Sequence, residues 1–322
     1  MHILKSQQFS RPLLEAVVRR ANEFEVLWRS SSGRYRMRQL FSEKMLFNSF
    51  ETESVRTHAS FCVAGLRLGM DVPPLQGGGR ISSEYRNRGE SLEDHIKVLN
   101  TMGPDVIVLR RPEEGAAERA ATVSRVPIIN AGDGKGQHPT QAVLDVGTIH
   151  QKFGAIDGLS IIIGGDLANG RTARSLAYLL AKFKDVKIMF VSPPELRMKS
   201  DVLEYLDKYH VTFTEHEVLE EVIAESKVIY WTRSQHEKAD GRVVYEDIER
   251  RYCIDAKMME RMQPDAILMH PLPRNEEIHH EVDSDPRAHY FRQTEYSVPI
   301  RMALLELALG GNSHAESLAE AA

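Results

Sequence analysis

The chain has 322 residues, which is long for a single hydrophobic core, so we expect two domains. Hydrophobic residues make up 42% of the sequence and the net charge is −5, values that indicate a soluble globular protein and exclude a broadly basic nucleic-acid surface. No apolar run reaches the roughly 20 residues that span a bilayer, and Cys62 and Cys253 cannot build a disulfide framework, so we expect a cytoplasmic protein with no membrane partner.

The first elements along the chain are a helix, a connector and a strand. Ser10-Arg11-Pro12, followed by apolar residues at helical spacing, predicts an N-capped helix. Residues 28–43 are polar and rich in arginine, and we predict that they form a connector. The apolar and aromatic segment 44–50 then predicts a short strand.

The stretch Ser54-Val55-Arg56-Thr57, which follows this strand and precedes a helical pattern, predicts an anion site. The first N–H groups of a helix have no partner inside the helix, and the helix dipole is positive there. The hydroxyls of Ser54 and Thr57 add donors, and Arg56 adds a planar fork that can bind two phosphate oxygens. The simpler alternative is an ordinary Ser/Thr cap with a surface arginine.

Two buried strands come next. The apolar run 105–109 ends at Arg110, and the run 126–130 leads into a glycine-rich loop with His138 and Gln141. In open α/β sheets ligands bind beyond the carboxyl ends of the strands, so Arg110 is expected beside Arg56. His138 and Gln141 project from one face if both lie in a first helical turn, and they would suit a carbamoyl group. A purely structural loop histidine is the alternative.

A second series of strands is predicted at 159–166, 186–191, 228–231 and 266–269. It lacks the GxGxxG pattern of dinucleotide-binding proteins. Two arginines at the strand ends suit an acceptor with two carboxylates. The residues at or just beyond these ends are Arg171, Arg233, Gln235, Pro271 and Leu272.

Taken in order, the motifs resemble those of the aspartate/ornithine carbamoyltransferase superfamily, in its aspartate form. The resemblance extends from about residue 3 to about residue 310. The matching segments are S-x-R-T, G-E-S, R-x-P-x-x-G-A-A, N-A-G-D-G-x-x-x-H-P-T-Q, G-D-L-x-x-G-R-T, T-R-x-Q and H-P-L-P-R.

The resemblance implies transfer of a carbamoyl group from carbamoyl phosphate to the α-amine of L-aspartate. It assigns the phosphate to Ser54, Arg56, Thr57 and Arg110, and the carbonyl oxygen to Thr57, Arg110 and His138. The departing phosphate takes the amine proton, so no dedicated base is required. No metal or organic cofactor is implied.

The remaining roles concern the carbamoyl NH2 and the acceptor. The resemblance assigns the NH2 group to Gln141 and to the backbone carbonyls of Pro271 and Leu272. It assigns the two carboxylates of aspartate to Arg171, Arg233 and Gln235.

The family also shares its sites between the chains of a homotrimer, through a loop that corresponds here to residues 81–89. The family's lysine is Arg88 in this chain, and its serine position falls on Glu84. A carboxylate that faces a phosphate is repulsive, so either the loop shifts or binding weakens. On its own, the loop is equally consistent with a solvated turn.

Three further positions depart from the family pattern. Val55 replaces a threonine and removes a hydroxyl donor. The glutamate that helps to latch the closed family enzyme is Thr52 here, and its arginine partner is Lys238. The sequence does not identify Glu51 or Glu53 as a substitute.

Three interpretations follow. The first is an aspartate carbamoyltransferase with an adapted site, the second a related enzyme with another amine acceptor, and the third a non-catalytic assembly or regulatory subunit. The family residues retained at the strand ends favour the first. Trimer pairing, control by nucleotides and a regulatory partner chain are left open.

The predicted fold is α/β, with two doubly wound parallel-sheet domains joined by interdomain helices. We expect a carbamoyl phosphate-binding domain at 1–137, with a helix at 291–310 that packs back on it. An aspartate-binding domain at 138–290 and a disordered tail at 311–322 complete the chain.

Overall fold

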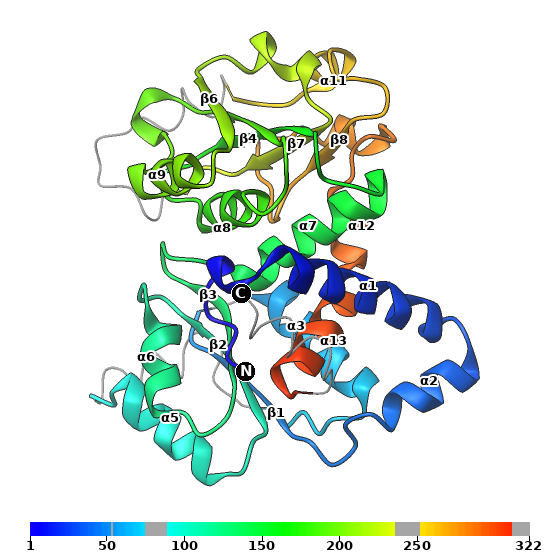
Figure 1. The fold of residues 1–322 in the computed structure, drawn as a ribbon, viewed down its shortest axis with the longest axis vertical. Helices are drawn as coiled ribbons and strands as arrows, with labels where there is room; N and C mark the ends of the chain where they lie inside the picture. Colours follow the sequence, from blue (N-terminus) through cyan, green and yellow to red (C-terminus); the bar gives the residue numbers. More distant parts are fainter. Residues whose placement is uncertain (53, 75–88, 236–251, 311–322) are drawn as a thin grey trace. The chain divides into compact units, whose positions relative to one another are not determined.

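The computed structural model describes residues 1–52, 54–74, 89–235 and 252–310 (Figure 1). These residues form two units. Unit 1 contains Met1–Gly147 and the segment from Tyr296 onward, and unit 2 contains Thr148–Glu295. No helix within the described ranges combines the length and apolar character needed to cross a membrane.

Unit 1 is a parallel sheet with helices on both faces. Its described strands pair in the order β1-β2-β3. Helices α5 and α6 cover one face, and α3, α1 and α13 pack together on the other (Figure 1). The elements are α1 (Arg11–Trp28), α2 (Ser31–Arg38), β1 (Leu46–Phe50), α3 (Val55–Leu68), α5 (Leu92–Thr101), β2 (Val106–Arg111), α6 (Ala116–Val123), β3 (Ile128–Asp133), the first part of α7 (Pro139–Phe153) and α13 (Ser297–Ala308).

Unit 2 has a larger parallel sheet, in the order β6-β5-β4-β7-β8 among the described strands. The chain builds outward from β4 to β6 and then returns to the other side of β4, which makes the β4/β7 boundary the topological switch point. The elements are β4 (Ser160–Gly165), α8 (Arg171–Leu180), β5 (Lys187–Val191), α9 (Ser200–Lys208), β6 (Thr212–His216), β7 (Val228–Thr232), α11 (Ala256–Glu260), β8 (Ile267–Met269) and α12 (Tyr290–Glu295).

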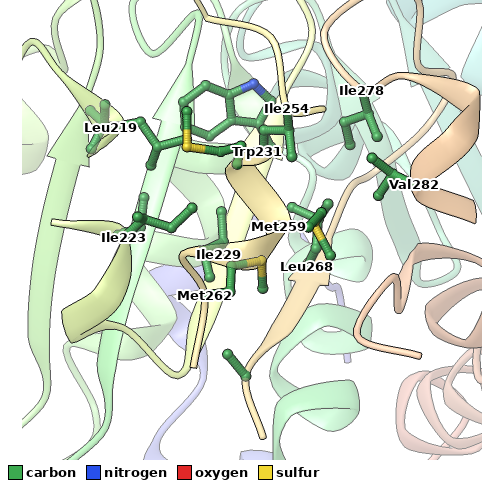
Figure 2. Packing of buried hydrophobic residues seen from close by; sticks show 14 of the residues in the cluster. Leu219, Ile223, Ile229, Trp231, Ile254, Met259, Met262, Leu268, Ile278 and Val282 are labelled. Carbon is green, nitrogen blue, oxygen red and sulfur yellow. The ribbon is translucent and has the colours of Figure 1, made fainter. Parts of the chain in front are cut away.

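A hydrophobic cluster underlies the β7 and β8 strands of this sheet. In Figure 2 the side chains of Trp231, Ile229 and Met262 belong to one group of buried residues. The indole nitrogen of Trp231 donates to the Tyr252 carbonyl at 3.0 Å, so the buried ring has its polar atom satisfied. This packing fixes β7, whose end carries Arg233.

The predicted cap at the first helix is confirmed, because Ser10 accepts from the Leu13 N–H at the start of α1. Ser91 caps α5 in the same way by accepting from the Asp94 N–H. The fold class is the predicted one, α/β with parallel sheets and helices in two units.

Two elements differ from the sequence prediction. Residues 28–43 contain helix α2, because Ser30 caps it through the Gly33 N–H and Met37 is buried beneath it. Strand β6 was not predicted, because its side chains are exposed or only partly buried and it lacks an apolar run. An edge strand of this kind takes its structure from pairing with β5.

The division between the units also lies later than the predicted boundary at 137/138. Arg301 of α13 donates to the Thr140 carbonyl, and a side chain at Gly147 would meet the Tyr296 ring. The first turns of α7 therefore pack with unit 1, and α7 continues into unit 2. Helix α12, predicted as part of the returning 291–310 segment, belongs to unit 2.

His289 makes the stability of unit 2 sensitive to acid. Burial, together with the nearby charges of Arg292 and Lys152, lowers the pKa of His289 to about 4. An unfolded histidine has a pKa near 6.5, so between these values the unfolded state binds the proton more tightly and stability falls as the pH decreases. From pH 7 to pH 5 the expected loss is about 2 kcal/mol.

Urea unfolding of a Trp28→Phe protein measures this loss, because Trp231 in unit 2 is then the remaining tryptophan. Adding His289→Asn lowers the free energy of unfolding by the same amount at pH 7 and pH 5, because asparagine does not titrate. The difference in unfolding free energy between the proteins with His289 and with Asn at this position should therefore be about 2 kcal/mol smaller at pH 5 than at pH 7. An unchanged difference would contradict the assignment.

Candidate functional site

The first turn of α3 carries the residues of the predicted anion site of unit 1. Ser54 precedes the helix with φ −161° and ψ 86°, and its side chain makes no capping hydrogen bond to the helix. The structure thus departs from an ordinary serine cap. Thr57 is buried, and Arg56 extends from the exposed side of the same turn. A hydroxyl that does not cap the helix suits an external acceptor better than a structural role.

Arg110 lies at the carboxyl end of β2, directly across from Phe50 of β1. Its Nε donates to the Thr52 hydroxyl at 3.1 Å, and its Nη1 donates to the Ala131 carbonyl at 2.9 Å. Contacts from the neighbouring segments on both sides hold the guanidinium at the sheet edge. The departure at Thr52 therefore has a definite role, which is to orient Arg110.

Glu51 is engaged within unit 1. It is 6% exposed and forms an ion pair with Arg111, while its backbone N–H donates to the Arg110 carbonyl at 3.0 Å. Burial lowers the pKa of Arg111. This pairing commits the Glu51 carboxylate to Arg111, which does not favour it as a replacement for the family's latching glutamate. Glu53 lies outside the described residues.

A buried carboxylate organises the loop after β3. Asp133 accepts from the Gln137 N–H at 2.7 Å through one oxygen and from the Gly115 N–H at 2.9 Å through the other. Gly134 has φ 51°, and a side chain there would lie 2.3 Å from the Pro112 carbonyl oxygen. The glycine is required for this approach, and the loop delivers His138 to the start of α7.

His138 directly precedes α7, and Gln141 lies in the first turn of that helix. His138 is 4% exposed, and its Nδ1 lies 3.2 Å from the Thr140 hydroxyl. When that hydroxyl donates, the ring proton resides on Nε2, which can then donate to a carbonyl oxygen. Gln141 donates through Nε2 to Asp145 at 2.8 Å, so its Oε1 is oriented to accept.

A second buried carboxylate organises the switch point of unit 2. Asp166, just beyond β4, accepts from the backbone N–H of Asn169 at 3.1 Å and from that of Gln235 at 3.0 Å. It is 1% exposed. The segments that follow β4 and β7 are therefore tied to one anion.

Arg171, Arg233 and Gln235 are carried by these two segments. Arg171 is the first residue of α8, and Arg233 and Gln235 directly follow β7. Both arginines are partly buried. Because β4 and β7 are parallel neighbours, their carboxyl ends lie at the same edge of the sheet. Two guanidinium groups at this edge are the right chemistry for paired carboxylates.

The end of β8 forms a bend at Pro271 and Leu272, and Leu272 has φ 53°. Nδ1 of His270 accepts from the Leu272 N–H at 2.8 Å, and its Nε2 lies 2.9 Å from Glu277. The ring proton is therefore on Nε2, and burial lowers the pKa of His270. This buried histidine fixes the backbone whose carbonyls the family resemblance assigns to the carbamoyl NH2.

The structure thus gathers the predicted residues at one edge of each sheet. Unit 1 carries Ser54, Arg56, Thr57, Arg110, His138 and Gln141, and unit 2 carries Arg171, Arg233, Gln235, Pro271 and Leu272. Arg88, Glu84 and Lys238 lie outside the described residues.

Sequence reasoning missed the residues that support these side chains, namely Asp133, Asp145, Asp166 and His270. The signal in the sequence that could have identified them was an acid or histidine at the end of an apolar strand or directly beyond it. Asp133, Asp166 and His270 follow that pattern, whereas Asp145 lies inside a helix and carries no such signal.

Comparison with known proteins identifies relatives over nearly all of the chain. Residues 1–151 match the family model "Aspartate/ornithine carbamoyltransferase, carbamoyl-P binding domain", and residues 157–308 match "Aspartate/ornithine carbamoyltransferase, Asp/Orn binding domain". The chain is 46% identical to the chloroplastic aspartate carbamoyltransferase of Arabidopsis thaliana, with 96% of this chain and 78% of that protein covered. It is 39% identical to the catalytic subunit from Methanocaldococcus jannaschii, with 97% and 98% covered.

A solved structure is similar as well. Aspartate transcarbamoylase from Trypanosoma cruzi, in complex with carbamoyl phosphate and aspartate, superposes with a TM-score of 0.86 at 37% identity. The alignment covers 94% of this chain and 95% of that one.

Gly165 provides a test of the switch-point geometry. It has φ 98°, and a Cβ there would lie 2.1 Å from the Thr232 carbonyl oxygen, whereas Gly158 has φ 76° with open space around it. Gly158→Ala should lower the free energy of unfolding by about 1–2 kcal/mol, because alanine must adopt the left-handed backbone conformation there. Gly165→Ala should cost about 1–3 kcal/mol more, because the neighbouring strand must move.

Urea unfolding of both variants in the Trp28→Phe background, followed by Trp231 fluorescence, compares them within the same unit. Equal losses for Gly158→Ala and Gly165→Ala would show that β4 and β7 do not approach as closely as described.

Proposed function

Because the chain belongs to the aspartate/ornithine carbamoyltransferase family, we propose that it transfers the carbamoyl group of carbamoyl phosphate to the α-amine of L-aspartate, a step of pyrimidine biosynthesis that yields N-carbamoyl-L-aspartate and phosphate. The observation that carries this proposal is the set of basic side chains at the strand ends of each unit. The aspartate carbamoyltransferase relatives favour aspartate over another amine acceptor.

Unit 1 supplies the groups for the donor. The first turn of α3, with Ser54, Arg56 and Thr57, binds the phosphate, which is the usual ligand of a helix N-terminus. Arg110, held at the end of β2 by Thr52 and Ala131, binds the donor molecule together with this turn. Thr57, Arg110 and His138 stabilise the negative charge that grows on the carbonyl oxygen as the amine attacks.

Gln141 and the β8 bend position the carbamoyl NH2. With its Nε2 committed to Asp145, Gln141 accepts from that group through Oε1. The carbonyls of Pro271 and Leu272 serve as further acceptors.

Unit 2 supplies the groups for the acceptor. Arg171 and Arg233 pair with the carboxylates of aspartate, with Gln235 as an additional contact. The amine nitrogen forms a bond to the carbonyl carbon, and the bond between that carbon and the phosphate oxygen breaks. The departing phosphate accepts the amine proton, so the reaction needs no side-chain base. Alignment of two bound substrates supplies much of the rate.

An acceptor screen with carbamoyl phosphate tests the reaction. L-Aspartate should give N-carbamoyl-L-aspartate, detected by mass spectrometry, whereas L-ornithine and L-2,3-diaminopropionate should give no product. Arg171→Met and Arg233→Met should each raise the KM for aspartate by about tenfold or more, the loss expected for one charged hydrogen bond. Their KM for carbamoyl phosphate should change little.

Product from another amine but none from aspartate would refute the proposed acceptor. The absence of product with every amine would support a non-catalytic subunit. The double variant Glu84→Ser, Arg88→Lys restores the family residues at these two positions. Its activity in the same assay, compared with that of the wild type, measures the effect of the two departures.

We also propose that the protein forms a homotrimer with shared sites, in which residues 81–89 of one chain complete the site of its neighbour. The exposed side of α3 supports an interface in unit 1. Val55, Val63 and Leu66 are 82%, 38% and 58% exposed and follow one side of the helix. An apolar strip of this kind is better explained by a second copy of the chain than by solvent.

Mixing of inactive variants tests the shared site. Arg88→Ala and His138→Ala chains should regain activity when dissociated and reassembled together, because some sites then contain no altered residue. His138→Ala mixed with Arg110→Ala is the matched control, since both residues belong to the same chain's part of each site. Recovery in the control, or none in the test mixture, would contradict sharing; sedimentation reports the oligomer directly.

We also propose that the protein is cytoplasmic and that it can bind a regulatory partner chain. Both cysteines are free, and burial raises the pKa of Cys62 and raises that of Cys253 to about 11, which is consistent with thiols that stay reduced.

A further inference from the structure

Arg301, on helix α13, is a fully buried guanidinium to which the proposed reaction assigns no role. It is 1% exposed, and its charge lies 5.3 Å from the centre of the Phe61 ring. Burial lowers the pKa of Arg301 to about 10, with the nearby Asp145 acting in the opposite direction. The side chain therefore stays charged at neutral pH. A buried charge is destabilising unless its contacts compensate, so the contacts of Arg301 indicate its role.

The direct contact of Arg301 is with the first turn of α7. Its Nη1 donates to the Thr140 carbonyl at 2.7 Å. Thr140 lies between His138 and Gln141, and its own hydroxyl lies 3.2 Å from Nδ1 of His138. The C-terminal helix thus holds the backbone of the turn that presents two of the proposed donor-binding side chains.

Asp145 provides a second connection. It is 0% exposed, and its Oδ1 accepts from Nε2 of Gln141 at 2.8 Å. A carboxylate can only accept, so this bond determines which end of the Gln141 amide is left for a ligand. Arg301 interacts electrostatically with Asp145, so the charge of Arg301 acts on the carboxylate that orients Gln141.

We propose that Arg301 is a positioning residue that gives the site its preference for a carbamoyl group over bare phosphate. It acts through Thr140 and Asp145 to present Oε1 of Gln141 to the carbamoyl NH2. This inference rests on the proposed function for the identity of the donor, but it concerns donor binding alone and is independent of the amine acceptor.

Calorimetric titration of Arg301→Met with two ligands tests the proposal. Carbamoyl phosphate should bind about tenfold more weakly than to the wild type, a factor equivalent to about 1.4 kcal/mol and within the range of one hydrogen bond. Inorganic phosphate lacks the NH2 group, so its affinity should be unchanged. Arg301→Lys keeps the positive charge but replaces the planar guanidinium with an ammonium group. It should therefore recover part of the carbamoyl phosphate affinity that Arg301→Met loses.

Arg20→Met is the matched control. Arg20 of α1 donates to both carboxylate oxygens of Glu306, at 2.6 and 2.8 Å, and so anchors the same helix α13 through a different residue from Arg301. This variant should lower the urea midpoint while leaving both ligand affinities unchanged. It separates loss of helix packing from loss of positioning.

A double-variant cycle completes the test. In a Gln141→Ala protein, Arg301→Met should cause no further loss of carbamoyl phosphate affinity, because the group that it positions is already absent. Equal weakening of both ligands by Arg301→Met, no weakening of either, or additive losses in the cycle would overturn the proposal. Wild-type protein that binds carbamoyl phosphate but carbamoylates no aspartate would refute the proposed acceptor and leave this test intact.

Discussion

Two buried carboxylates determine where the functional side chains of this protein lie. Asp133 ends β3 in unit 1, Asp166 directly follows β4 in unit 2, and each accepts backbone N–H groups from two separate segments. A buried carboxylate is stable only when such donors surround it, so each acid requires its loops to keep one arrangement. The loops in turn carry His138, Arg171 and Gln235. An acid at a strand end thus organises both the edge proposed to bind the donor and the edge proposed to bind the acceptor.

The departures from the family pattern have a coherent physical basis where the structure describes them. Thr52 replaces a charged residue and uses its hydroxyl to accept from Arg110. Glu51, one residue earlier, forms an ion pair with Arg111. The acidic group at this edge therefore pairs with Arg111, and the Thr52 hydroxyl holds Arg110 in place. A site in which the arginine is retained and re-anchored favours an adapted enzyme over a chain that has lost its chemistry.

Much of the fold and site could be predicted from sequence because the signals were local. Apolar runs identified the buried strands, and polar residues at their ends identified Arg110 and Arg233. Strand β6 was missed because pairing with β5, not an apolar pattern, forms it. Helix α2 was missed because its sequence is mostly polar and has no apolar residues at helical spacing. The cap at Ser30 and the burial of Met37 were therefore not recognised. The partnership of Arg301 with Thr140 joins residues 161 positions apart, and no local pattern encodes such a contact.

Transfer of the carbamoyl carbon to the amine of aspartate is the central claim, and nuclear magnetic resonance with labelled substrates tests it directly. Carbamoyl phosphate labelled at its carbonyl carbon and aspartate labelled at its nitrogen should give a product whose carbon signal is split by the attached nitrogen, with phosphate released in equal amount. A carbon signal that appears only as bicarbonate, with no splitting in any product, would contradict the account.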